Sequence, residues 1–297
     1  MAVTTPGAPD PLLSLVIATL GEAQTLAGCL ASLAEQREAP PFEVIVVDQN
    51  GDDRLDAMVQ GYSGRLDITH ERVAFRAASR ARNHGARLAR GRWLGFPDDD
   101  CRLLPDALQQ VARSTAEPGV RVVTGQTIDH DGRPNVLRWA AEPVRFTRWT
   151  MFGCLTEATL FVDRDAFLAA GGFDERFGPG GRYPAAEGIE LMNRLFRRLG
   201  TGQALYNPAI RMRHPTKIPP WNRWAVHRLR SYAVGDGALI AKNPEPHILY
   251  WGVRTIGASV LQALACDGWR SIAFAARLLG LFRGMGAFTL ARLTWRA

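Results

Sequence analysis

Short apolar runs alternate with amphipathic segments through the first half of the chain. Residues 12–19 and 42–48 are almost continuously apolar and rich in β-branched side chains, a pattern typical of strands buried on both faces. Between them, residues 22–36 place leucines at helical spacing. A strand, a helix and a second strand in this order predict a parallel sheet with a right-handed crossover.

The same alternation continues along the chain. It predicts a strand near 67–73, a helix at 77–89, a short buried strand from residue 93, a helix at 103–114 and a strand at 120–128. These elements predict an α/β fold with a doubly wound, mostly parallel sheet up to about residue 125. A further strand is expected near 204–206.

The apolar run that starts at Trp93 stops at three consecutive carboxylates, Asp98, Asp99 and Asp100. Adjacent carboxylates repel one another, so they are tolerated in water, at a helix N-terminus or facing a cation. In parallel sheets ligands bind at the carboxyl ends of strands. Thr19 and Asp48 also end predicted strands, so one crevice could hold all these side chains. An exposed acidic turn is the alternative.

Composition narrows the class of protein. The chain has 297 residues, of which 46% are hydrophobic, so it can bury a full core and is not expected to be disordered. The net charge is +7, and residues 247–297 alone carry six arginines against one aspartate. These arginines lie among apolar residues rather than in a polar basic stripe, so we expect no nucleic-acid partner.

The cysteines and the N-terminus bear on the compartment. Cys29, Cys101, Cys154 and Cys266 are far apart and form no CxxC pair, which suggests neither a zinc knuckle nor a disulfide framework. Residues 1–10 lack the basic start and apolar stretch of a signal peptide. We therefore expect a cytoplasmic protein.

Several segments, in this order, resemble family 2 glycosyltransferases, which have the GT-A fold. They are residues 15–19 with Glu22, 44–48, 81–86 with 89–91, 96–100 as the DxD motif, 160–162, 171–175 and 187–191. The resemblance covers roughly residues 12 to 215. It implies a Rossmann-like nucleotide-sugar-binding half at 1–125 fused to an acceptor-binding half at 126–219, with a helical extension at 220–297.

The resemblance also implies roles in donor binding. Asp48 would accept hydrogen bonds from the base of a nucleotide-diphosphate sugar, and Thr19 and Glu22 would line the nucleotide pocket. Arg82, beside Asn83, would supply positive charge. The alternative for Asp48 is a turn former at the end of a strand.

A divalent metal, Mn²⁺ or Mg²⁺, is the implied cofactor, because it neutralises the charge of the leaving diphosphate. Asp100 would bind this metal, Asp98 would approach the metal or the ribose, and Asp99 would lie in the same diphosphate seat. His214 occupies the place where related enzymes have a further metal or diphosphate ligand. An ordinary packed or surface histidine is the alternative.

The catalytic base is expected in the acceptor half. Inverting transfer needs a carboxylate that takes the proton from the acceptor hydroxyl. The usual family pattern is Glu-Asp-x-Asp with the first Asp as base, but here glycine stands at that position, in Glu187-Gly188-Ile189-Glu190. Glu187 and Glu190 share a helix face, and Glu187 is preferred because it starts the helix. The alternative is that one of them caps the helix or pairs with an arginine.

The character of the chain changes beyond residue 219. Tryptophans and tyrosines lie among arginines, Gly235-Asp236-Gly237 interrupts a helical pattern, and two apolar helices are expected between residues 247 and 296. Neither has an arginine-free stretch of the ~20 residues that a membrane span requires. Interfacial helices on an anionic inner leaflet would explain both the charge and the apolarity. Packing on the main domain or in a homodimer is the alternative.

The sequence therefore predicts a metal-dependent, inverting hexosyltransferase, peripheral on the inner face of the cell membrane. It would move a sugar from a nucleotide-diphosphate donor, for which a UDP-sugar is expected, to a lipid-linked or polysaccharide acceptor in cell-surface glycan biosynthesis. The alternative is a non-catalytic binding or assembly protein of the same family, which Gly188 in place of the usual base suggests.

Overall fold

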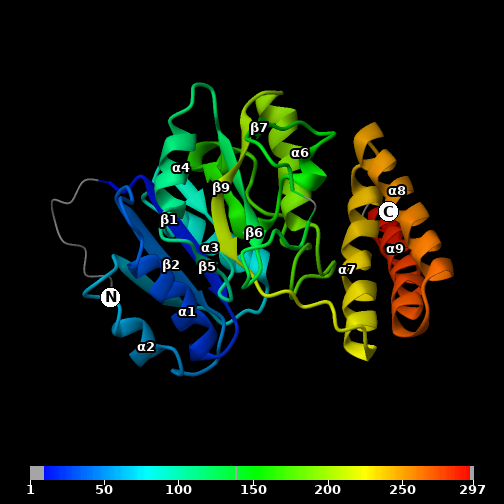
Figure 1. The fold of residues 1–297 in the computed structure, drawn as a ribbon, viewed down its shortest axis with the longest axis horizontal. Helices are drawn as coiled ribbons and strands as arrows, with labels where there is room; N and C mark the ends of the chain where they lie inside the picture. The colour runs from blue at the N-terminus through cyan, green and yellow to red at the C-terminus, as the bar shows by residue number, and fades with distance from the viewer. Residues whose placement is uncertain (1–9, 138, 295–297) are drawn as a thin grey trace. The chain divides into compact units, whose positions relative to one another are not determined.

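The computed structural model describes residues 10–137 and 139–294, which contain one mixed sheet and a set of helices (Figure 1). The described strands form a nine-stranded sheet in the order β3-β2-β1-β4-β8-β6-β9-β5, with β7 paired to β9. They are β1 (Leu13–Thr19), β2 (Phe42–Asp48), β3 (Ile68–Arg72), β4 (Trp93–Gly95), β5 (Arg102–Leu103), β6 (Val122–Ile128), β7 (Val144–Arg145), β8 (Leu160–Asp163) and β9 (Ala204–Arg213).

The sheet is mostly parallel, as the sequence predicts. β1 pairs in parallel with β2 and with β4, β2 with β3, and β6 with β9. β8 is antiparallel to both of its neighbours, β4 and β6. The doubly wound fold class is confirmed.

The helices follow the strands in alternation through the first half of the chain. They are α1 (Ala23–Ala34), α2 (Asp56–Gln60), α3 (Ala78–Leu88), α4 (Ala107–Thr115), α5 (Arg164–Ala169), α6 (Glu187–Leu199), α7 (Arg223–Lys242), α8 (Pro246–Ala265) and α9 (Gly268–Thr294), with short 3₁₀ turns at Met151–Gly153 and Glu157–Thr159. The helix expected at 103–114 begins later, at Ala107, because residues 102 and 103 pair with β9 as β5.

The chain divides into two compact units. The first contains Met1–Phe173 and Leu191–Pro215, and the second contains Asp174–Glu190 and Thr216–Ala297, so far as these residues are described. The first unit holds the sheet, and the second holds α7, α8 and α9. The three functional segments expected from the sequence, 1–125, 126–219 and 220–297, stay a prediction.

In the second unit α7 runs without interruption from Arg223 to Lys242, so the break expected at residues 235–237 is absent from this described helix. Gly237 lies where helix α9 approaches closely: a Cβ there would come 2.0 Å from the carbonyl oxygen of Leu281. Gly284 has the same role on α9, because a Cβ there would lie 2.1 Å from the carbonyl oxygen of Val234. Glycine in this helix permits close packing instead of ending the helix.

The two C-terminal helices, α8 and α9, expose most of their apolar side chains. By length and composition alone both are sufficient to cross a membrane, and 22% and 28% of their most apolar windows are buried. A core helix of a soluble protein passes the same test of length and composition.

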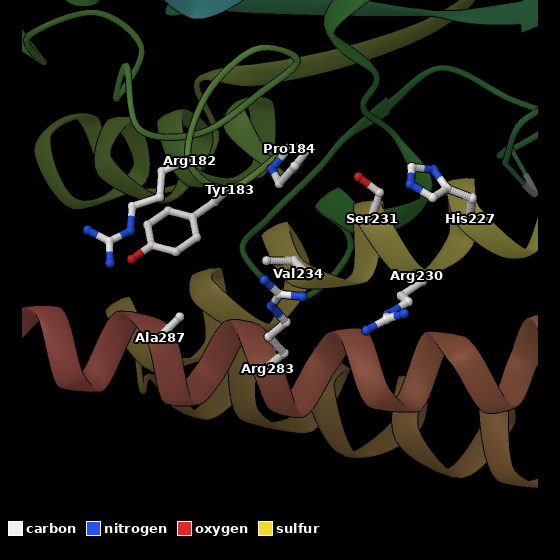
Figure 2. A pocket seen from close by; sticks show the side chains of 9 residues that line it. All are labelled: Arg182, Tyr183, Pro184, His227, Arg230, Ser231, Val234, Arg283 and Ala287. Carbon is white, nitrogen blue, oxygen red and sulfur yellow. The ribbon is translucent and has the colours of Figure 1, made fainter.

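The second unit also contains a pocket of about 470 Å³. It is lined by residues 182–184, α7 and α9 (Figure 2).

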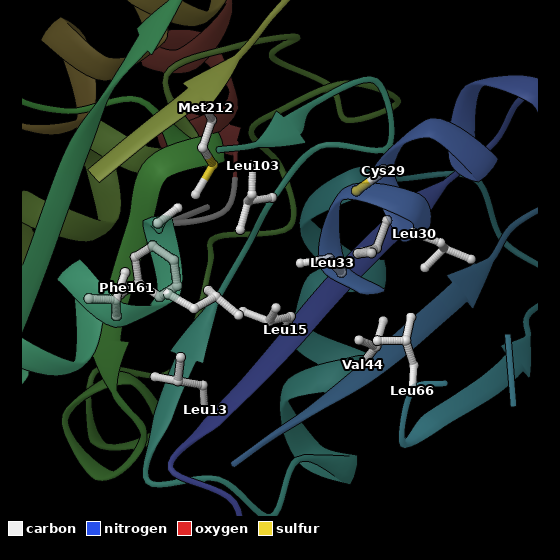
Figure 3. Packing of buried hydrophobic residues seen from close by; sticks show 14 of the residues in the cluster. Leu13, Leu15, Cys29, Leu30, Leu33, Val44, Leu66, Leu103, Phe161 and Met212 are labelled. Atoms are coloured by element: carbon white, nitrogen blue, oxygen red, sulfur yellow. The ribbon is translucent and has the colours of Figure 1, made fainter. Parts of the chain in front are cut away.

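The core of the first unit covers both faces of the parallel strands. Leu13 and Leu15 of β1 pack with Leu30 and Leu33 of α1 and with Val44 of β2 (Figure 3). These side chains alternate along each strand and lie on one face. Burying one such side chain contributes about 1.5–3 kcal/mol, so this face supplies much of the driving force for folding.

Helix α3 covers the opposite face of the same strands. A Cβ on Gly85 would lie 2.4 Å from Cγ1 of Val16 and 3.0 Å from Cγ2 of Val47, so the helix packs directly on the sheet. Val16 and Val47 alternate with the residues that face α1. Burial on both faces explains why the strands are continuously apolar.

Candidate active site

Three neighbouring parallel strands bring polar residues to one edge of the sheet. Thr19 ends β1 and lies opposite Asp48, which ends β2. β4 ends at Gly95, and the chain then turns through Asp98, Asp99 and Asp100. The hydroxyl of the buried Thr19 donates a hydrogen bond to Oδ2 of Asp99 over 2.6 Å, which joins the end of β1 to the acidic turn.

Helix α3 provides a cation for this turn. Nη2 of Arg82 donates to Oδ1 of Asp98 at 2.7 Å, and the Arg82 side chain is only 6% exposed. A charge-assisted hydrogen bond in such a sheltered position is stronger than one in water. Arg82 therefore offsets part of the repulsion among the three carboxylates.

His214 lies next to the same acids. It directly follows β9, and its backbone N–H donates to the carbonyl oxygen of Ile128 at 3.0 Å. Its Nε2 lies 3.9 Å from Oδ2 of Asp98 and 3.9 Å from Oδ1 of Asp100. Residues more than a hundred positions apart in the sequence thus face one point.

The donor set suits a hard divalent cation. One ligand atom from each of Asp98, Asp100, Cys101 and His214 lies within 4.8 Å of all the others. Oxygen ligands of Mg²⁺ lie about 2 Å from the ion, so atoms around one ion are separated by up to about 4 Å. The carboxylates and the imidazole meet this spacing with small side-chain adjustments, and carboxylates are ligands that Mg²⁺ and Mn²⁺ prefer.

Cys101 belongs to this group by distance but not by chemistry. Burial, and to a smaller extent the charges of Asp98 and Asp100, raise the pKa of its thiol well above the ordinary value. The thiolate, not the thiol, binds metals. Thiolate is also a soft ligand that suits Mg²⁺ and Mn²⁺ poorly, so Asp98, Asp100 and His214 stay the predicted ligands.

Asp48 lies in a second polar cluster at the same edge. It is fully buried, and its Oδ1 accepts hydrogen bonds from the backbone N–H and the side-chain amide of Asn50, at 2.8 and 2.9 Å. Nε2 of His70 lies 3.1 Å from its Oδ2, and Nδ1 of His70 lies 3.6 Å from Asp56. Sequence reasoning missed Asn50 and His70; the signal for His70 is its position on β3, beside β2 in parallel register.

Two further residues predicted to bind the nucleotide, Asn83 and Glu22, make contacts outside the Asp48 cluster and the acidic turn. The amide of Asn83 donates to the carbonyl oxygen of Phe173 at 2.9 Å and accepts from its backbone N–H at 2.8 Å, so it fixes the backbone at Phe173. Glu22 precedes α1 with its side chain 82% exposed, 3.7 Å from Arg54. Their roles toward a nucleotide stay predictions.

The two candidate bases belong to the second unit. Glu190 is fully buried, and the ammonium group of Lys242 donates to its Oε1. Nζ of Lys242 also donates to Oδ2 of Asp174 at 2.6 Å. Burial of Asp174 opposes ionisation, but hydrogen bonds from Arg176 and Lys242 outweigh it and hold its pKa well below the ordinary value.

Glu187 occupies the first position of α6 and is 5% exposed. The preceding residue, Ala186, has a φ of +70°, which is uncommon for a residue other than glycine. Such backbone conformations cost about 1–3 kcal/mol and cluster at functional sites. The positive φ of Ala186 therefore supports the hypothesis that the start of α6 has a functional role.

The mostly parallel sheet with helices on both faces is a GT-A-like fold. The chain belongs to glycosyl transferase family 2, whose profile matches residues 14–173. The family resemblance and the fold expected from the sequence are both confirmed.

The similar proteins include a named glucosyltransferase and a succinoglycan biosynthesis protein. Validoxylamine A glucosyltransferase of Streptomyces hygroscopicus subsp. limoneus is 39% identical over 135 residues, which are 43% of this chain and 30% of that protein. The succinoglycan biosynthesis protein ExoO of Rhizobium meliloti is 28% identical over 165 residues, 53% of this chain and 45% of that protein. The chain thus spans less than half the length of these relatives.

Solved structures share the fold at low identity. Mannosyltransferase PcManGT from Pyrobaculum calidifontis, in complex with GDP-Man and Mn²⁺, has a TM-score of 0.58 at 18% identity, covering 96% of this chain and 77% of that one. S. aureus TarS 1-349, in complex with UDP-GlcNAc, has a TM-score of 0.59 at 16% identity, covering 94% and 92%. These identities establish the fold alone.

Proposed function

We propose that this chain is an inverting, metal-dependent glycosyltransferase that moves a sugar from a nucleotide-diphosphate donor to a lipid-linked or polysaccharide acceptor. The main observation in support is that Asp98, Asp100 and His214 lie close together. They lie at the edge of the sheet where β1 ends at Thr19 and β2 ends at Asp48. UDP is the proposed nucleotide. The GDP-Man and UDP-GlcNAc bound by proteins of the same fold support a nucleotide-sugar donor.

Asp98, Asp100 and His214 would hold Mn²⁺ or Mg²⁺. When bound, the cation neutralises the charge that develops on the leaving diphosphate. Arg82, held by Asp98, adds a fixed positive charge beside the same group. Thr19 positions the acidic turn through its hydrogen bond to Asp99.

Asp48 would recognise the base of the donor. Its carboxylate is oriented by Asn50 and His70 and is fully buried, so a neighbouring side chain would have to move before an N–H of the base could donate to it. Glu22 and Asn83, at the start of α1 and on α3, complete the proposed nucleotide pocket.

Glu187 would be the catalytic base. It would accept the proton of the acceptor hydroxyl while that oxygen attacks the anomeric carbon. Glu187 is preferred because it starts the helix, whereas Glu190 is fully buried and accepts a hydrogen bond from Lys242. Gly188, at the usual position of the base, then leaves the role to a neighbouring side chain.

The acceptor and the location of the enzyme rest on other observations. The succinoglycan biosynthesis protein and the hyaluronan synthase of Pasteurella multocida, 36% identical over 98 residues, support polysaccharide synthesis. Exposed apolar side chains on α8 and α9, among arginines, support a cytoplasmic enzyme peripheral on an anionic membrane surface. A homodimer that covers these helices is the alternative.

The metal assignment is tested with Asp100→Asn. Thermal shift with UDP should show a Mn²⁺-dependent stabilisation of the wild-type chain that the variant loses, because the variant lacks one charged ligand. Asp165→Asn, on the exposed side of α5, is the matched control and should keep the response. An unchanged Mn²⁺-dependent response in Asp100→Asn would show that the metal lies elsewhere.

The base assignment is tested with Glu187→Gln. Transfer should fall by about 10²–10⁴-fold, the usual contribution of general base catalysis, while UDP-sugar binding is retained. Glu190→Gln should affect stability more than transfer. If Glu190→Gln alone abolishes transfer, the base is Glu190; a wild-type chain that binds donor but transfers to no acceptor is the non-catalytic alternative.

A further inference from the structure

A second site lies in the unit that carries the C-terminal helices, in the pocket of about 470 Å³. Its lining comes from three segments: the loop before α6, helix α7 and helix α9. Figure 2 shows Arg182, Arg230 and Arg283 around this pocket, one from each segment. His227 and Ser231 of α7 also line it, and its described lining contains no aspartate or glutamate.

The positive charges of this pocket are not neutralised within the described part of the chain. Arg182 lies 5.8 Å from the ring centroid of Tyr183, and among described residues neither Arg230 nor Arg283 has an ion pair or a side-chain hydrogen bond. Clustered cations without carboxylates repel one another and attract anions. All three arginines are exposed, so water screens part of this repulsion, and the net positive charge of the lining favours an anionic ligand.

The adjoining pocket, of about 340 Å³, makes the contrast clear. It shares Arg182 and Tyr183 with the first pocket, and its other cations include Arg176 and Lys242. Both of these donate to Asp174, at 2.7 and 2.6 Å. Two cations of the second pocket are thus committed to a carboxylate within the fold, whereas the three arginines of the first pocket are not.

The helices hold two of these arginines in place. A Cβ on Gly280 would lie 2.3 Å from the carbonyl oxygen of Arg230, so the backbones of α7 and α9 touch beside the pocket. Gly284, next to Arg283, makes the same close approach on α7. This packing fixes the backbone positions of the two arginines, while their exposed side chains can turn toward a ligand.

We propose that this pocket binds the phosphate or diphosphate group of a lipid-linked acceptor. The inference rests on the proposed function, whose acceptor it narrows to one that carries phosphate. Guanidinium groups bind phosphate oxygens through paired hydrogen bonds, and His227 and Ser231 add further donors. Tyr183 and Phe288, whose ring centroids are 5.7 Å apart in the adjoining pocket, provide apolar walls for the hydrocarbon next to the phosphate.

The test is binding of farnesyl diphosphate and of inorganic diphosphate to the full chain in EDTA, which removes the cation from the proposed donor site. The double variant Arg230→Gln/Arg283→Gln removes two lining charges. Arg223→Gln/Arg254→Gln removes two exposed charges from α7 and α8 outside both linings and is the matched control. We expect about 100-fold weaker farnesyl diphosphate binding for the lining variant, roughly tenfold for each arginine, and less than about threefold for the control.

Equal losses in the two double variants would overturn the proposal, because binding would then reflect net charge. A second result would also overturn the proposal: the lining variant still binds farnesyl diphosphate tightly but no longer binds vesicles that contain phosphatidylglycerol. The arginines would then bind membrane headgroups. Thermal shift with UDP and Mn²⁺ separates this site from the donor site. Loss of the nucleotide response with retained, arginine-dependent diphosphate binding would refute the proposed function and leave the phosphate site standing.

Discussion

Replacement of Lys242 by methionine removes the ammonium group that joins Asp174 and Glu190. Nζ lies 2.6 Å from Oδ2 of Asp174, and the side chains of Lys242, Asp174 and Glu190 are 19%, 13% and 0% exposed. At an effective dielectric constant of about 20, one such contact amounts to ~6 kcal/mol before desolvation is subtracted. Removing one partner of a buried pair costs ~3–5 kcal/mol, and the partial exposure of Lys242 places our expectation near ~3 kcal/mol.

The assay is urea denaturation followed by tryptophan fluorescence. Lys242→Met should lower the free energy of unfolding by about 3 kcal/mol, and Lys242→Arg should lose less because it keeps the charge. In a Glu190→Gln background the cost should shrink, since one of the carboxylates is then neutral. A loss below about 0.5 kcal/mol, or the same loss in both backgrounds, would refute the reasoning.

The stability lost in Lys242→Met should depend on pH. The folded-state pKa of Asp174 lies below its unfolded value of about 3.9, so the stabilising contribution is fully present above that value and is lost as pH falls through the folded pKa. The stability difference between the wild type and Lys242→Met should therefore be constant above about pH 5 and narrow below about pH 4. A difference that widens on acidification would contradict this sign.

Two further predictions concern packing and the membrane. Gly95→Ala should cost about 1–3 kcal/mol by overpacking, because the new Cβ would lie 2.6 Å from the Phe161 ring, whereas Gly257→Ala, with no atom within 4 Å, should be neutral or stabilising in chemical denaturation. Leu261→Gln/Leu264→Gln, at positions 67% and 80% exposed, should reduce cosedimentation with anionic vesicles about tenfold or more; unchanged sedimentation would favour a packed or dimeric surface.

The local pattern was sufficient for the longer strands and helices of the first unit, but not for the short elements α2, β5, β7 and α5. Apolar runs of β-branched residues became strands buried on both faces, because α1 and α3 cover opposite sides of them. The pattern failed at Gly235 and Gly237, where a helix continues. Glycine is a helix breaker in isolation, but here α9 leaves no room for a Cβ at Gly237, and the backbone of Ala185 leaves none at Gly235.

Part of the candidate site could also be predicted from the sequence, and part could not. Asp48 and Asp98 to Asp100 could be placed together from the sequence, since parallel strands share a carboxyl edge. The ion pair of Arg82 with Asp98 and the contacts of His70 with Asp48 depend on which side chains face each other across elements. No local spacing encodes these contacts.

The sequence by itself determined the family, the alternation of strands and helices, and the edge of the sheet where acidic residues gather, because each of these follows from short-range pattern and strand direction. Tertiary structure alone decided that Lys242 holds Glu190, and that three arginines from separate segments line one pocket. The physical reason is that charge pairing and pocket lining depend on distances between side chains far apart in the chain, which only the packed fold sets.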